Sequence, residues 1–142
     1  MNTATVDTTS VNSISQSYGR CINQPKFFDT FYKKILDSNP KIAPMFSNTD
    51  FEKQKDLLRK SIIYVITYAD KPNSHFAQQK LFEVGTIHSI SNINVPPELY
   101  PYWSKSLIDT IAEFDPQFSL ELEQQWYLVV EPALDLLASK YR

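Results

Sequence analysis

Apolar residues recur at helical spacing along most of the chain, and the segments that carry them are separated by proline-containing corners. No segment shows the sustained two-residue alternation that indicates a β-strand. The apolar stripes predict helices over about residues 11–22, 25–38, 50–69, 74–88, 97–114 and 119–142. We therefore expect an all-α domain of about six to eight helices.

Prolines and small polar residues mark the ends of several of these helices. Pro25 can occupy the first turn of the second helix, because an N–H at that position has no helical partner anyway. Ser74 and Ser119 can cap the fourth and the last helix. Pro132 falls inside the last apolar stripe, so we expect a bend or a local break there.

The third helix has the clearest start and the clearest inner face. Thr49 and Glu52 have the spacing of a capping box, so the helix should begin near Asp50. If the register slipped by one residue, Leu57 rather than Leu58 would face the interior, and Gln54 would turn away. In the expected register, the inward stripe consists of Phe51, Gln54, Leu58, Ile62 and Val65.

The composition is that of one ordinary folded domain, for which we expect a tail over residues 1–10 and a domain over residues 11–142. The 142 residues suffice for one core, and 42% of them are hydrophobic. Acids and bases are interleaved and the formal net charge is −2, so we expect no nucleic-acid partner. The longest dense apolar run, Ile62 to Ile66, is far shorter than the roughly 20 residues that cross a bilayer, so we expect no membrane partner.

Cysteine content and the first residues point to a reducing compartment. Cys21 is the only cysteine, which excludes an internal disulfide, and a buried thiol is a better interpretation than a covalent anchor for a tetrapyrrole. Residues 1–15 are rich in Thr, Ser and Asn and lack the basic start and apolar core of a secretory signal. These features favour a cytoplasmic protein.

His88 is the main candidate for chemistry. Leu81, Val84 and His88 recur at helical spacing, so they share one face and direct an imidazole at an apolar interior. Taken alone, a histidine on such a stripe is more often a core residue with a satisfied hydrogen bond than a ligand. His75 lies in a polar corner, where we expect a solvated surface histidine.

A set of residues spread along the chain decides between these two interpretations. It comprises Phe31-Tyr32, Asn39-Pro40, Phe46, Gln54 with Leu58, Gly85 with His88, Pro97-Glu98-Leu99-Tyr100, and Trp126. In this order and at these separations, the residues resemble the globin family, specifically single-domain bacterial globins and the haem domain of flavohaemoglobins. The resemblance covers about residue 11 to the end. It implies a globin fold around a haem pocket, with haem b (iron protoporphyrin IX) as the cofactor.

The resemblance also implies roles for individual residues. His88 would be the proximal ligand of the haem iron, and Phe46 would pack flat on the porphyrin. Tyr32 and Gln54 would face the opposite, distal side, where Leu58 closes the pocket with an apolar wall. The alternatives are an ordinary core phenylalanine at position 46 and a solvent-facing glutamine in a charged helix start. Further contacts to the haem would come from Val95, Tyr100 and Trp103.

The distal pair has a specific chemical consequence. Dioxygen bound to ferrous haem carries negative charge, so hydrogen-bond donors strengthen its binding, whereas carbon monoxide gains less charge and benefits less. Tyr32 and Gln54 are both donors. A hydrogen bond to a charged group contributes roughly 1.5 to 3 kcal/mol, or about a 10-fold to 150-fold change in an equilibrium constant.

On the proximal side, Tyr100 matches a tyrosine that flavohaemoglobins place near the ligand histidine. Those proteins also bring a carboxylate from the last helix toward that histidine, and the corresponding position here is Tyr141. A carboxylate would make the imidazole more basic. Because Tyr141 stands at this position in place of a carboxylate, the sequence argues against a strongly peroxidase-like site.

The resemblance implies a haem protein that reversibly binds dioxygen, nitric oxide and carbon monoxide. One alternative is a nitric oxide dioxygenase, which would need a separate reductase because the chain has no dinucleotide-binding motif. A gas sensor domain and a haem-free domain of the same fold are further alternatives. Tyr127 and Leu128 flank Trp126 and cannot all face inward, so we expect part of the last helix to form a homodimer contact.

Overall fold

Six α-helices and two short 3₁₀-helices make up the regular structure of residues 8–87 and 95–141, the part of the chain that the computed structural model describes. Within this part there is no β-strand, so the prediction of an all-α fold is confirmed. The first three residues of α1, 8–10, fall within the segment expected as a tail. The elements are α1 (Thr8–Ile22), α2 (Phe27–Ser38), η1 (Ala43–Phe46), α3 (Phe51–Asp70), α4 (His75–Ile87), η2 (Pro97–Leu99), α5 (Tyr100–Phe114) and α6 (Leu120–Ser139).

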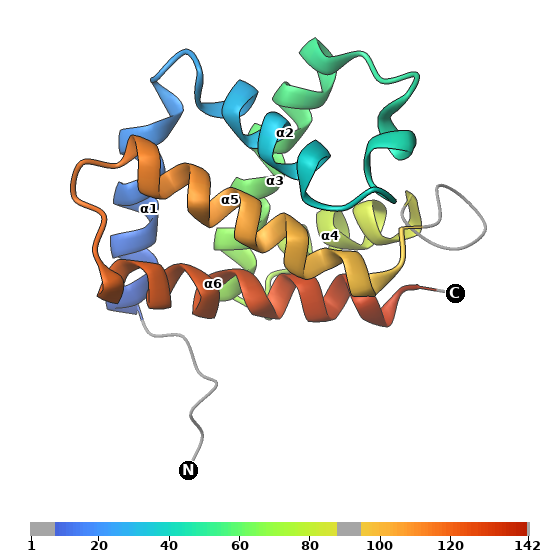
Figure 1. Ribbon diagram of the computed structural model, residues 1–142. Helices are drawn as coiled ribbons and strands as arrows, with labels where there is room; N and C mark the ends of the chain where they lie inside the picture. The colour runs from blue at the N-terminus through green and yellow to red at the C-terminus, as the bar shows by residue number, and fades with distance from the viewer. Residues whose placement is uncertain (1–7, 88–94, 142) are drawn as a thin grey trace.

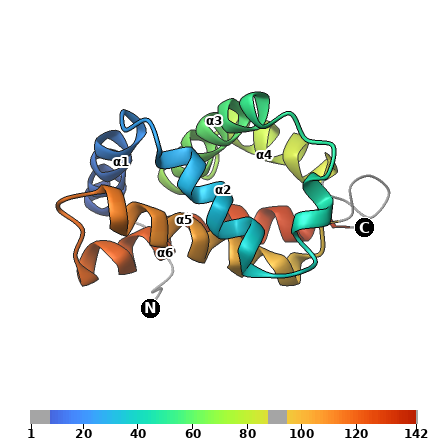
Figure 2. The same ribbon diagram turned by 45° about the horizontal axis from the view of Figure 1, so that its top comes forward.

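The helices pack in two main pairs, α2 against α5 and α3 against α6. Helices α5 and α6 run antiparallel, and α1 crosses the end where they are joined (Figure 1). Figure 2 shows α2 crossing α5, with α3 beside α4. Both views place η1, the end of α4 and the start of α5 at the opposite end of the molecule from α1. None of the helices in the described segments has the length and apolar character needed to cross a membrane.

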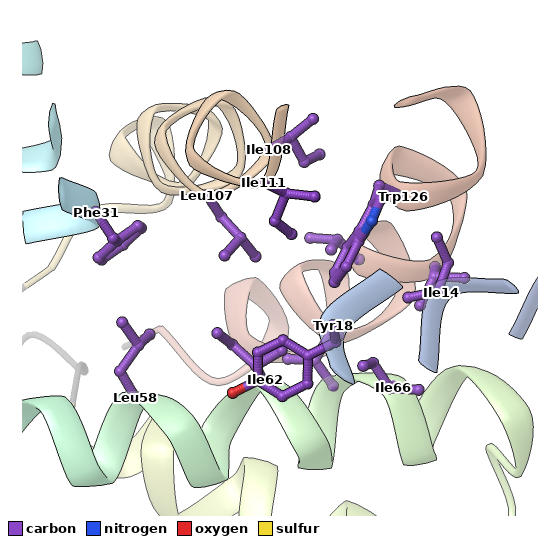
Figure 3. Close-up of a cluster of buried hydrophobic side chains, with 14 of the residues drawn as sticks. Ile14, Tyr18, Phe31, Leu58, Ile62, Ile66, Leu107, Ile108, Ile111 and Trp126 are labelled. Atoms are coloured by element: carbon purple, nitrogen blue, oxygen red, sulfur yellow. The ribbon is translucent and has the colours of Figure 1, made fainter. Parts of the chain in front are cut away.

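The core lies where α1, α3, α5 and α6 meet. Trp126 of α6, Ile14 of α1 and Ile62 of α3 are fully buried there, together with Leu107 and Ile111 of α5 (Figure 3). Full burial of an aliphatic side chain contributes about 1.5–3 kcal/mol relative to its exposed state. Burial of these apolar faces therefore stabilises the helices and determines which side of each helix packs against its neighbours.

The predicted start of α2 and the predicted cap of α3 are wrong, whereas α3 begins next to Asp50 as expected. Helix α2 begins at Phe27 rather than at Pro25, because a turn in which the Phe27 N–H donates to the Gln24 carbonyl (3.1 Å) comes first. Helix α3 is capped by Asp50 and not by a Thr49–Glu52 capping box. The Asp50 carboxylate accepts hydrogen bonds from the N–H groups of Glu52 (3.1 Å) and Lys53 (3.4 Å).

The other predicted caps are confirmed, and the predicted break is not found. The Ser74 hydroxyl accepts from the Ala77 N–H (3.3 Å), and the Ser119 hydroxyl accepts from the Leu122 N–H (3.0 Å). Helix α6 continues through Pro132 to Ser139. Proline removes the N–H that would donate to the carbonyl of Leu128, and since Leu128 is exposed, water can replace that donor.

A buried polar network joins α1 to the corner between α5 and α6. The Asp115 carboxylate accepts from the Ser17 hydroxyl (2.6 Å) and from two nitrogens of Arg20 (2.6 and 2.9 Å). The Trp126 indole N–H in turn donates to the Ser17 hydroxyl (3.0 Å). Burial by itself would raise the pKa of Asp115, but the hydrogen bonds from Arg20 and Ser17 outweigh it and lower the pKa below its ordinary value.

We predict that Asp115→Asn lowers the free energy of unfolding by about 2–3 kcal/mol at pH 7, because a charge-assisted hydrogen-bond set loses its acceptor. The pKa of Asp115 is lowered in the folded state, so the stability it contributes is present above the unfolded pKa of about 4 and is lost as pH falls through the folded pKa. Urea unfolding of both proteins from pH 7 to pH 3 should therefore show the difference shrinking at the acid end. Asp135→Asn, at an exposed position on α6, is the matched control. A difference that stays constant with pH would contradict the prediction.

Candidate functional site

Tyr32 lies on the inner face of α2 and is surrounded by aromatic rings. It is 5% exposed, and its ring meets those of Phe31, Phe46 and Phe51 edge to face, at centroid distances of 5.0, 6.0 and 5.4 Å. Phe31 continues the contact to Trp103 of α5 (6.2 Å). Tyr32 is thus held by rings from three elements, α2, η1 and α3, and Phe31 links this cluster to α5.

The Tyr32 hydroxyl reaches the first turn of α3. It donates a hydrogen bond to the main-chain carbonyl of Gln54 (3.2 Å). Burial raises the pKa of Tyr32 to about 12, although its hydrogen bond with the Gln54 side chain acts in the opposite direction. The phenol therefore stays protonated, and able to donate, far above neutral pH. The structure brings together the two polar residues that the sequence singled out.

The register of α3 is the expected one. Leu58 is 5% exposed, whereas Leu57 is 55% exposed and faces solvent. Gln54, one turn before Leu58, is half-buried, while Glu52 and Lys53 beside it are exposed. Gln54 is therefore not an outward-facing member of the charged helix start.

A set of apolar side chains packs against the core but stays partly exposed. Phe46, at the end of η1, belongs to it, and its ring stacks on that of Phe51 (6.0 Å, 22°). The set comes from η1, α3, α4, the residues before η2, and α5, and it consists of Met45, Phe46, Phe51, Val84, Val95 and Trp103. Incompletely buried apolar side chains of this kind suit contact with a large apolar partner.

His88 lies outside the described residues, so its role stays a prediction. Helix α4 ends at Ile87 in the described part of the chain. Leu81 is 1% exposed and Val84 packs on the core, so the α4 face on which the sequence places His88 is the inner face. His75, at the start of the same helix, is exposed, as expected for a surface histidine.

Tyr100 is the first residue of α5 and is 7% exposed. Burial raises its pKa, and Tyr141 lies close enough to raise it further by electrostatic repulsion. Tyr100 also lines a groove of about 500 Å³ between α5 and α6. The structure therefore brings Tyr100 together with the residue that occupies the expected carboxylate position.

Sequence reasoning gave no role to Phe51. The residue appeared in the predicted inner stripe of α3, but the contact of its ring with Tyr32 joins two helices and depends on how they cross. The available signal was that Phe51 precedes Gln54 by three residues on the same face. At the other end of the stripe, the structure agrees with the prediction, since Ile62 and Val65 are buried.

Comparison with known proteins identifies the family. A scan against protein-family models and a search of curated proteins each gave no match. A crystal structure from Pseudomonas aeruginosa PAO1, of a protein described as structurally highly homologous to a human hemoglobin, is 34% identical in sequence, with a TM-score of 0.87 over 93% of this chain and 98% of that one. This chain belongs to the globin family.

The globin fold expected from the sequence is thereby confirmed, and a hemoglobin-like fold suggests that the protein binds haem. Three members of the partly exposed apolar set make ring contacts: Phe46 and Phe51 meet Tyr32, and Trp103 meets Phe31, so these contacts link α2 to η1, α3 and α5. Tyr127 and Leu128 are 40% and 48% exposed on α6, and the homodimer contact expected there stays a prediction.

We predict that Leu58→Ala lowers the free energy of unfolding by about 2–4 kcal/mol, because it removes a buried side chain from the inner face of α3. Leu57→Ala is the matched control, with the same chemical change one residue away on the solvent face, and should change stability by less than about 0.5 kcal/mol. Chemical denaturation of both variants checks the register. A larger loss at Leu57 than at Leu58 would show that the helix is rotated, and equal losses would contradict the prediction.

Proposed function

We propose that this globin binds haem b non-covalently and uses it to bind dioxygen, carbon monoxide and nitric oxide reversibly, with Tyr32 and Gln54 as distal donors and His88 as the proximal ligand. The observation that carries the proposal is the buried Tyr32 hydroxyl, held at the first turn of α3 beside Gln54 and one helical turn from the inward-facing Leu58. A protonated phenol in an apolar setting is a strong donor to a ligand atom that carries negative charge.

The residues present fit a haem. The partly exposed apolar side chains Phe46, Val95 and Trp103 offer a flat macrocycle aromatic and aliphatic contact, and Leu58 supplies an apolar wall. Cys21 is fully buried in α1, and no second cysteine exists to complete a thioether attachment motif. These facts support a non-covalent haem b rather than a covalently attached haem.

The bound haem would supply an iron with an open coordination position for the gas. Around that position, the chain's own residues would set selectivity. Tyr32 and Gln54 would donate hydrogen bonds to a ligand with negative charge on its outer atom, and Leu58 would exclude water. Tyr100 and Tyr141 would contribute aromatic side chains on the proximal side, and Tyr141 would stand where a carboxylate would increase the basicity of the imidazole.

The proposal is tested first by haem binding. The parent protein should take up haem and give a ferrous carbon monoxide spectrum with a sharp Soret band, and His88→Ala should lose or shift that band because the imidazole ligand is removed. His75→Ala, at the exposed start of α4, is the matched control and should keep the parent spectrum. If His88→Ala and the parent give the same spectra, the proximal assignment is wrong; if the parent takes up no haem, the function is wrong.

The distal assignment makes a separate prediction. Tyr32→Phe should raise the dioxygen dissociation rate by about 10-fold to 150-fold, because it removes a hydrogen bond to a charged ligand, and should change carbon monoxide dissociation far less. Tyr64→Phe, at a partly buried tyrosine of α3 whose ring contacts Phe76 of α4, is the control. Stopped-flow ligand replacement measures both rates. Equal effects on the two gases would contradict a hydrogen-bonding role.

A further inference from the structure

Phe51 is the ring that connects Tyr32 to α3. Of the three rings around Tyr32, Phe31 is its neighbour in sequence and moves with α2, and Phe46 belongs to η1. Phe51 is the first residue of α3 and meets Tyr32 edge to face (5.4 Å, 74°). Gln54 and Leu58 lie on the same helix as Phe51. The contact between Phe51 and Tyr32 therefore holds the Tyr32 ring in a fixed orientation relative to these two other residues of the proposed distal side.

The position of Phe51 is itself fixed on two sides. The Asp50 cap sets the start of α3 directly before it, and the ring stacks on Phe46 (6.0 Å, 22°). Lys55, one turn further on, forms salt bridges with Asp29 of α2 and Glu52, which join the first turns of α3 to the helix that carries Tyr32. The ring therefore has little freedom to move away from Tyr32.

This arrangement has a consequence for hydrogen bonding. The Tyr32 oxygen is held against the Gln54 carbonyl, to which it donates over 3.2 Å. A phenol proton can rotate about the C–O bond, so a ligand that arrives within reach of the oxygen can receive the hydrogen bond without a change of ring orientation. Holding the ring in place before binding removes most of the entropic cost of ordering a flexible donor.

We propose that Phe51 is a positioning residue for the distal hydrogen bond: its ring, stacked on Phe46, holds the Tyr32 side chain in the orientation from which the hydroxyl donates. The proposal deepens the gas-binding function proposed above and rests on it. Phe51 acts through Tyr32 and is not itself expected to contact the ligand.

The test is a double-mutant cycle on the haem-loaded protein. Phe51→Leu should raise the dioxygen dissociation rate by about 2-fold to 10-fold, the range expected for losing one edge-to-face contact. The same substitution in a Tyr32→Phe background should have no further effect, because no hydroxyl is left to position. Phe51→Tyr, which keeps the ring, should restore the parent rate, and Phe76→Leu, at an exposed aromatic on α4, is the control. An effect of equal size in both backgrounds, or none in either, overturns the proposal.

A second readout separates this proposal from the proposed function. In protein without added haem, the ring-flip rate of Tyr32 from NMR relaxation of labelled tyrosine should rise by about 2-fold to 10-fold in Phe51→Leu and stay at the parent value in Phe51→Tyr. If the parent binds no haem but the flip rate still responds, the gas-binding function fails while the positioning contact stands. If the flip rate does not respond, the positioning role is wrong. Phe51→Met, which nearly conserves volume, replaces Phe51→Leu if that variant does not fold.

Discussion

The register of α3 is the constraint on which the candidate site depends. Asp50 accepts hydrogen bonds from the first turn and so fixes the helix start, and a cap of this kind contributes about 1 kcal/mol. The burial of Leu58, Ile62 and Val65 against the other helices holds the same register more strongly. A rotation of about 100°, which is one residue, would place Leu57 inside and turn Gln54 away from Tyr32. The Asp50 cap and the buried side chains therefore both stabilise the register in which Gln54 and Leu58 face the candidate site.

The buried polar network and the candidate site occupy different parts of the molecule. The network of Ser17, Arg20, Asp115 and Trp126 ties α1 to the corner between α5 and α6. The aromatic rings around Tyr32 come partly from η1 and the start of α3, and η1 lies at the end of the molecule away from α1 (Figure 1). The buried charge of Asp115 is satisfied by direct partners, so its field is largely neutralised locally. Tyr32, by contrast, is buried among the rings of Phe31, Phe46 and Phe51, an apolar setting in which a hydroxyl is a stronger hydrogen-bond donor than in water.

The sequence predicted the helices and the inner face of α3, because burial imposes a periodic pattern that a single chain displays. The sequence predicted a Thr49–Glu52 capping box for α3, and this was wrong: Asp50 caps the helix, in keeping with the advantage of a carboxylate at a helix N-terminus. It also missed the Phe51–Tyr32 contact and the network between Ser17 and Asp115, which are 98 residues apart. Such contacts depend on how helices cross, and local spacing carries no information about that. The role of His88 rests on resemblance and on the inward face of α4.

The setting of Cys21 determines how this globin can be handled. The thiol is fully buried, and burial raises its pKa to about 12, so the reactive thiolate is scarce near neutral pH. Intermolecular disulfides should therefore not accumulate while the chain is folded, even in air. Conversely, a reagent can reach the thiol only when the helices around it separate. The rate at which Cys21 is modified therefore reports how often this part of the fold opens.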